Sequence, residues 1–232
     1  MFLQRLVEYS QRIPQAPTLY SEAPIRYHIS LDRQGRLLAL IDTADPSNPR
    51  TKNGQRRLAP RVQRTSAVKP LLLSDTGEYT LGAAAPDAKP QRVADAHRAY
   101  LAQIDRCRAA TAEPAIEAVQ RFLQADPLAQ LNLPPDFDPG MNVTFLVDGA
   151  FVIDLPSVQA FWAAENAPGG GPSTPAPVMQ CIVCGQVRPV LPRLQTKIKG
   201  VPGGQTSGTS IISANNEAFE SYGLEASLIA PT

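Results

Sequence analysis

Residues 143–155, VTFLVDGAFVIDL, carry the clearest structural signal in the sequence. Two apolar runs flank Asp148-Gly149, and an Asp-Gly pair readily adopts the positive φ angles of a two-residue hairpin turn. The stretch therefore predicts a β-hairpin.

Neighbouring segments extend this picture to an α+β fold. Residues 25–31 alternate with period two, and a turn at residues 32–35 leads to a second strand over residues 36–41, which predicts another hairpin. We therefore predict an α+β domain with a mixed or antiparallel sheet built from hairpins, packed by helices and joined by long basic loops. Further short strands are expected at residues 71–73 and 78–82, a long polar connection at 45–69, and helices at 2–12, 91–109, 112–125, 157–165 and 217–222.

The composition is typical of a globular protein. The chain has 232 residues, of which 43% are hydrophobic and 19% charged, so it forms one domain or one domain plus a smaller one. It contains no apolar run of about 18 residues, and its start is too polar for a signal peptide. Three cysteines do not make a disulfide framework, so we expect a cytoplasmic, reducing compartment and no membrane contact.

The net charge of +1 hides an uneven distribution of charge. Residues 46–74 and 166–216 contain no Asp or Glu, and we call them the first and second acid-free stretches. If they meet in space, they form a surface that attracts polyanions, whereas the alternative is two solvated loops that lack acids. Their basic residues are Arg50, Lys52, Arg56, Arg57, Arg61, Arg64 and Lys69 in the first, and Arg188, Arg193, Lys197 and Lys199 in the second.

The second stretch contains residues 197–213, KIKGVPGGQTSGTSIIS, which combine four glycines with five hydroxyl side chains. Glycine lets a backbone approach another molecule closely, and free N–H and hydroxyl groups bond phosphate and sugar oxygens. Gln205 could touch base edges or wedge into a base stack. The alternative is a flexible surface loop with no partner. The apolar run IIS that follows argues against this alternative, because it would anchor the loop firmly. The predicted DNA-binding residues here are Lys197, Lys199, Gly203, Gly204, Gln205, Thr206, Ser207 and Ser210.

The same loop is not a nucleotide-hydrolysing P-loop, because its lysines precede its glycines and it leads toward a strand. Cys181 and Cys184 have the spacing of half a zinc site, but no second pair exists, and a thioredoxin-like redox role is no better supported. His28 and His97 lack a nucleophile in a suitable setting. We therefore predict no metal, no cofactor and no catalysis.

The run CIVCGQVRPVLPRLQTKIKGVPGGQTSGTSIISANNEAFESYGLEASLIAP, residues 181–231, resembles the large subunit of type I-C CRISPR Cascade complexes. The matching core is KIKGV, then G-x-Q-x-S-G, then N-x-x-AFESYG and a final AP. Earlier segments are similar in order: LQRLVEYSQRI, LIDTAD and RTSAVKPLLLSDTGEYTLG. Two departures matter. Cys184 replaces a usual threonine, which argues against zinc. KPLLL at residues 69–73 replaces KPNFL, so the asparagine and phenylalanine are absent, which argues against base-reading by that segment.

The resemblance implies a DNA-surveillance subunit without nuclease activity. It implies binding beside the guide RNA and other Cascade subunits, recognition of the motif flanking the target in double-stranded DNA, help in opening the duplex, and docking of a helicase-nuclease. Residues 1–232 would then be the N-terminal DNA-recognition domain of a longer subunit, with a possible sub-boundary at the linker 166–177. Arg64, Ser66 and Lys69 would also contact DNA, and Arg56, Arg57 and Arg61 would contact phosphates or guide RNA.

Two other function classes stay open. In one, the chain is a protein-interaction scaffold whose basic stretches meet acidic neighbouring subunits and never touch nucleic acid. In the other, which the sequence favours least, it is a hydrolase or metalloenzyme built on Cys181.

Overall fold

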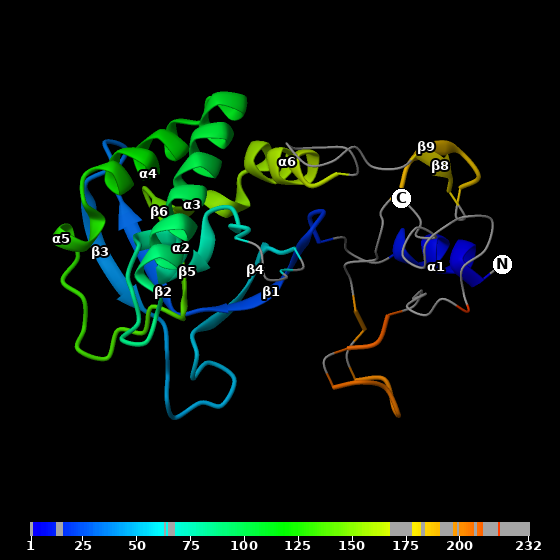
Figure 1. Ribbon diagram of the computed structural model, residues 1–232, viewed down its shortest axis with the longest axis horizontal. Coiled ribbons are helices and arrows are strands. Elements are labelled where there is room, and N and C mark those ends of the chain that lie inside the picture. The colour runs from blue at the N-terminus through cyan, green and yellow to red at the C-terminus, as the bar shows by residue number, and fades with distance from the viewer. Residues whose placement is uncertain are drawn as a thin grey trace. The chain divides into compact units, whose positions relative to one another are not determined.

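The chain folds into two compact units in a computed structural model (Figure 1). We call Ala16–Ala163 the sheet unit, and Met1–Gln15 with Ala164–Thr232 the hairpin unit, and we describe each by itself. The structure describes residues 2–12, 16–62, 64, 68–167, 178–181, 184–190, 197–198, 200–206, 208–210 and 218.

The sheet unit contains a five-stranded mixed sheet. β2 pairs antiparallel with β3 and parallel with β6, and β6 pairs antiparallel with β5 and β7. The α+β class with a mixed sheet is therefore confirmed. The strands are β2 (Tyr27–Leu31), β3 (Leu37–Asp42), β5 (Ser74–Thr76), β6 (Asn142–Val147) and β7 (Ala150–Phe151), and a separate two-stranded sheet joins β1 (Tyr20–Ile25) to β4 (Gln55–Pro60).

Helices pack against this sheet and against each other (Figure 1). α3 begins at a proline and buries Val93, Tyr100 and Ile104 at helical spacing, while α4 also begins at a proline and places Phe122 against Phe145 of β6, with ring centres 6.4 Å apart. The helices predicted at residues 91–109 and 112–125 are therefore confirmed. The helices are α2 (Gly77–Leu81), α3 (Pro90–Thr111), α4 (Pro114–Gln124), α5 (Pro127–Gln130), the 3-10 turn η1 (Val152–Asp154) and α6 (Pro156–Glu165), which reaches past the end of the sheet unit.

Both predicted hairpins form, with differences in length. β2 and β3 pair around the turn at residues 32–36, with a bulge at Ser30/Leu31. β6 and β7 pair around Asp148-Gly149, both at positive φ, as a turn of this kind requires. β7 ends at Phe151, however, because the chain turns into η1, so the second strand is shorter than expected.

Two local predictions are wrong. Residues 71–73 are a buried loop rather than a strand, with Leu73 at φ 56°. Residues 78–81 belong to α2, and Gly82 ends this helix in the left-handed conformation. The strand between them is β5. The connection 45–69 also contains β4, which pairs with β1, a strand that the sequence did not indicate before Ile25.

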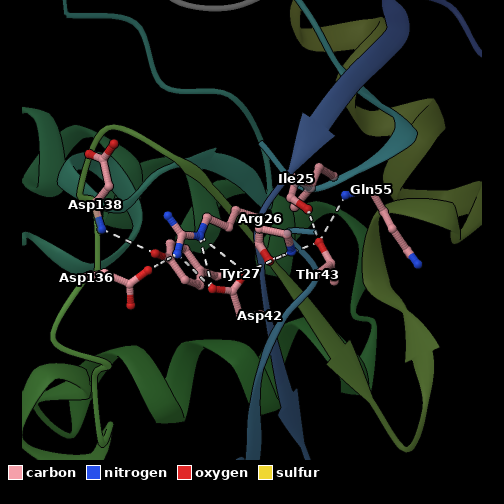
Figure 2. Close-up of polar contacts among 9 residues, drawn as sticks. Ile25, Arg26, Tyr27, Asp42, Thr43, Gln55, Asp136 and Asp138 are labelled. Carbon is pink, nitrogen blue, oxygen red and sulfur yellow. Dashed lines mark hydrogen bonds and ion pairs between the residues drawn. The ribbon is translucent and has the colours of Figure 1, made fainter. Parts of the chain in front are cut away.

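A polar junction around Arg26 joins the two sheets, as Figure 2 shows. Arg26 lies between β1 and β2, and its Nε and Nη2 donate to Asp42 Oδ2 at 3.0 and 2.9 Å. Asp136 bonds the same guanidinium. Burial by itself raises the pKa of Asp42, but the hydrogen bonds from Arg26 and from the Ala44 N–H, with the charge of Arg26, together hold this pKa below its usual value.

Thr43 completes the junction from the end of β3 (Figure 2). Its hydroxyl donates to the Ile25 carbonyl at 2.7 Å and accepts from the Gln55 N–H at 3.0 Å. One side chain thus ties the end of β1 to the start of β4.

Residues 43–54 form an ordered loop that projects from the sheets (Figure 1). Successive turns hold it, with the Asp45 N–H donating to the Thr51 carbonyl at 3.1 Å and the Gly54 N–H to the same carbonyl at 2.8 Å. Gly54 has φ +104°, and a Cβ there would lie 2.3 Å from the Ile25 carbonyl oxygen. Only glycine fits this closure.

We predict that Gly54→Ala lowers the free energy of unfolding by more than about 3 kcal/mol, because it adds a clash with β1 to the strain of positive φ. Gly149→Ala is the matched control: Gly149 has φ +78° but nothing within 4 Å of a Cβ, so only strain of about 1 kcal/mol is expected. Urea unfolding of both variants measures the difference. Equal losses would contradict the described closure of the loop on β1.

Candidate nucleic-acid interface

The glycine loop of the hairpin unit is closed by one backbone pair. The Ile198 N–H donates to the Thr209 carbonyl at 2.8 Å, and the Thr209 N–H donates back to the Ile198 carbonyl at 2.8 Å. This reciprocal pair fixes the ends of a loop that spans ten residues, 199–208, between them. We call Lys197–Ser210 the glycine loop.

Two tight turns follow each other inside the loop. The Gly204 N–H donates to the Val201 carbonyl at 2.9 Å, with Pro202 and Gly203 between them and Gly203 at φ +75°. Proline followed by a positive-φ glycine is the pattern of a type II turn. The Gly208 N–H then donates to the Gln205 carbonyl at 2.9 Å, which makes the second turn.

The loop's glycines fall into two groups. A Cβ on Gly204 would lie 2.4 Å from Thr209 Oγ1, and a Cβ on Gly208 would lie 2.7 Å from Lys197 Cβ, so these two allow the loop to pack on itself. A Cβ on Gly200 or Gly203 would meet nothing within 4 Å, and both glycines are exposed, so their backbone is accessible. The sequence did not distinguish these two roles.

The packed loop surrounds a hollow of about 460 Å³. Thr209 Oγ1 is buried and has no hydrogen-bond partner among the described residues. Gln205 and Thr206 are exposed at the second turn. The predicted Lys199 and Ser207 lie outside the described residues, and the hollow is lined by Lys197, Gly203, Gly204, Gln205, Gly208, Thr209 and Ser210.

On β4 of the sheet unit, two predicted phosphate-contacting arginines are already paired. Arg56 Nε lies 3.2 Å from a carboxylate oxygen of Glu22 on β1. Arg57 pairs with Asp154 and stacks its guanidinium 3.5 Å from the ring centre of Phe151. Both cations are therefore partly neutralised by acids far away in the sequence.

Arg64 is held more firmly, by a carboxylate with no exposed surface. Arg64 Nη2 pairs with Asp75 Oδ2, its Nε donates to the Lys69 carbonyl at 2.7 Å, and its guanidinium lies 4.3 Å from the ring centre of Tyr79. The Leu71 N–H also donates to Asp75, at 2.8 Å. Burial raises the pKa of Asp75 above its usual value, although the bonds from Arg64 act in the opposite direction. Asp75 therefore holds both the Arg64 side chain and the Leu71 backbone.

Four other cations of the first acid-free stretch are exposed, and their side chains form no ion pair or hydrogen bond within the part of the chain that the structure describes. Arg50 and Lys52 project on the loop 43–54. Arg61 directly follows β4, and Lys69 is the residue whose backbone carbonyl accepts from Arg64. Ser66 is outside the described residues. The free positive charge is thus smaller than the sequence suggested.

Sequence reasoning missed the acids that pair with this stretch. Asp75 directly follows the acid-free stretch, so its position was a usable signal. Glu22 reaches Arg56 only through the β1–β4 pairing, and Asp154 of η1 reaches Arg57 across a long stretch of chain. No spacing in the sequence indicated either pair.

Among the described residues, no histidine or cysteine lines the glycine loop's hollow. His28 is buried on β2, and burial, with the charge of Arg57, lowers its pKa. His97 Nδ1 contacts the Tyr79 carbonyl at 2.9 Å. Within the described ranges, His, Cys, Asp and Glu form no group of three that could hold a metal ion.

No described helix is both long and apolar enough to cross a membrane.

We predict that Arg64→Ala lowers the free energy of unfolding by about 3 kcal/mol, because it leaves the buried Asp75 carboxylate without its counter-charge. Arg61→Ala, the matched control, should change stability by less than about 0.5 kcal/mol, since its side chain is exposed and unpaired. Chemical unfolding at neutral pH measures both. A loss at Arg64 as small as that at Arg61 would show that the ion pair does not organise this segment.

A known protein family matches this chain. The family model described as CRISPR-associated protein (Cas_Csd1) matches residues 4–232, while no curated protein matches the chain. The match covers the glycine loop and both acid-free stretches, and it confirms the resemblance seen in the sequence. The chain belongs to the CRISPR-associated Csd1 family, the large subunits of type I-C Cascade complexes.

Proposed function

We propose that this chain is the DNA-recognition part of a type I-C CRISPR surveillance complex in the cytoplasm. It binds double-stranded DNA beside the target, recognises the flanking motif and helps to open the duplex, without catalysing a reaction itself. The observation that carries the proposal is the accessible backbone of the glycine loop at Gly200 and Gly203, beside the exposed Lys197.

The loop's chemistry supports contact with a DNA backbone. Phosphate oxygens accept hydrogen bonds from backbone N–H and hydroxyl groups, and glycines without side chains let the two backbones come close. Thr206, Ser207 and Ser210 supply hydroxyls around the turns. Lys197 and Lys199 add attraction that weakens with salt, because each phosphate contact releases counterions.

Gln205 begins the loop's second turn and is exposed. Its amide carries a donor and an acceptor, which suits either a base edge in a groove or insertion beside a base pair. Insertion of this kind would help to separate the strands at the flanking motif.

The sheet unit contributes the remaining contacts in this proposal. Arg61 and Lys69 are exposed and unpaired among the described residues, so they can reach DNA or guide-RNA phosphates at low cost. Arg56, Arg57 and Arg64 would have to share or leave their carboxylate partners to do so. Guide RNA, other Cascade subunits and a recruited helicase-nuclease are the partners of the assembled complex.

A protein-interaction scaffold is the second candidate, and one observation favours it. The edge strand β3 exposes Leu38 and Ile41, at 61% and 43% of their surface. Such side chains fit a neighbouring subunit better than a polynucleotide. A chain that binds partner protein without RNA, and whose complex shows no dependence on the glycine loop for DNA binding, would fit this candidate.

We predict that Lys197→Ala with Lys199→Ala weakens binding of motif-bearing duplex by the assembled complex. The slope of log affinity against log salt should fall by about 1 for each lysine that contacts a phosphate. Gel-shift titrations at several salt concentrations measure both quantities.

Lys89→Ala with Arg92→Ala is the matched control. It removes the same charge from exposed positions at the start of α3, outside both acid-free stretches. If the two double variants change affinity and salt slope equally, the glycine loop makes no specific contact with DNA.

A further inference from the structure

Two cysteines of the hairpin unit share one tight turn. β8 (Val178–Gln180) and β9 (Val187–Pro189) pair antiparallel, and the Cys181 N–H donates to the Gln186 carbonyl at 2.9 Å to close the turn between them. The Gly185 N–H donates back to the Cys181 carbonyl at 2.8 Å. These two bonds close the turn, so Cys181 and Cys184 lie within one turn of chain, three residues apart in sequence.

A disulfide needs Cβ atoms about 3.5–4.5 Å apart, and a short closed turn of this kind is a setting in which two cysteines can meet that need. Cys184 is at the surface, whereas Cys181 is buried at 2% exposure. One thiol is thus open to a reagent and the other is shielded from it.

Arg188 of β9 contacts the exposed sulfur. Its Nη2 donates to Cys184 Sγ at 2.6 Å. Contact with Cys184, and more weakly the charge of Cys181, raises the pKa of Arg188. A guanidinium at a sulfur favours the negative charge that the sulfur carries when it acts as a nucleophile.

We propose that Cys184 and Cys181 are a redox-active pair that hydrogen peroxide oxidises to a reversible disulfide. The Cys184 thiolate attacks one peroxide oxygen, the O–O bond breaks, and the departing hydroxide takes a proton to leave as water. Cys184 is then a sulfenic acid. The Cys181 sulfur attacks the Cys184 sulfur, the S–O bond breaks, and the second hydroxide leaves as water with the Cys181 proton. Two thiols are oxidised and one peroxide is reduced to two waters.

Disulfide formation has a consequence for charge. It removes the thiol that Arg188 contacts, so an arginine in the second acid-free stretch becomes free to bind an anion. The pair does not depend on the proposed DNA contact, because it involves none of the glycine loop's residues.

The test is mild oxidation of the purified chain with a few equivalents of hydrogen peroxide, followed by alkylation and peptide mass spectrometry. We expect a Cys181–Cys184 disulfide that dithiothreitol reverses, while Cys107, fully buried on α3, stays reduced. Cys184→Ser should abolish the disulfide, and Cys181→Ser should leave a sulfenic acid at Cys184 that dimedone traps.

Arg188→Met tests the role of the guanidinium and leaves both thiols in place. It should slow oxidation of Cys184 by at least about threefold, and Arg188→Lys should slow it less. Oxidation of Cys184 no faster than that of free glutathione would overturn the proposal. So would disulfides only between chains, or one bound zinc ion per chain that protects both thiols.

Discussion

The buried carboxylate of Asp75 is the constraint on which the first acid-free stretch depends. Its side chain has no exposed surface, and a carboxylate removed from water must be bonded on all sides to be tolerated. Arg64 and the N–H groups of Leu71 and Thr76 meet that need. These bonds tie Arg64 and Leu71 to one carboxylate, and they decide which cations of the stretch face solvent. Arg64 is committed to the fold, and Lys69 is left free.

Much of the fold was predictable from short-range patterns. The Asp148-Gly149 turn, the alternation before β3 and the prolines at the starts of α3 and α4 are local signals, and each produced the expected element. Strand β4 was not predictable in this way. Half of its residues, QRRLAP, are polar, and they form a strand because β1 offers an edge to pair with.

The candidate site divides along the same line. The composition of the glycine loop predicted a close approach to another molecule, and this stays a prediction. The separate roles of its glycines depended on where Thr209 and Lys197 lie once the Ile198–Thr209 pair forms. The ion pairs of Arg56 and Arg57 depended on contacts across 34 and 97 residues of chain. Charge counted along a sequence therefore overstated the charge available to a polyanion.

The central claim is that DNA lies against the bare backbone of the glycine loop. Hydrogen exchange of the amides of Gly200, Val201, Gly203, Gln205 and Thr206, in the assembled complex with and without motif-bearing duplex, tests it most directly. The account predicts that these amides exchange more slowly when duplex is bound, because phosphate oxygens accept hydrogen bonds from their N–H groups. Unchanged exchange at these residues in a complex that holds the duplex would contradict it.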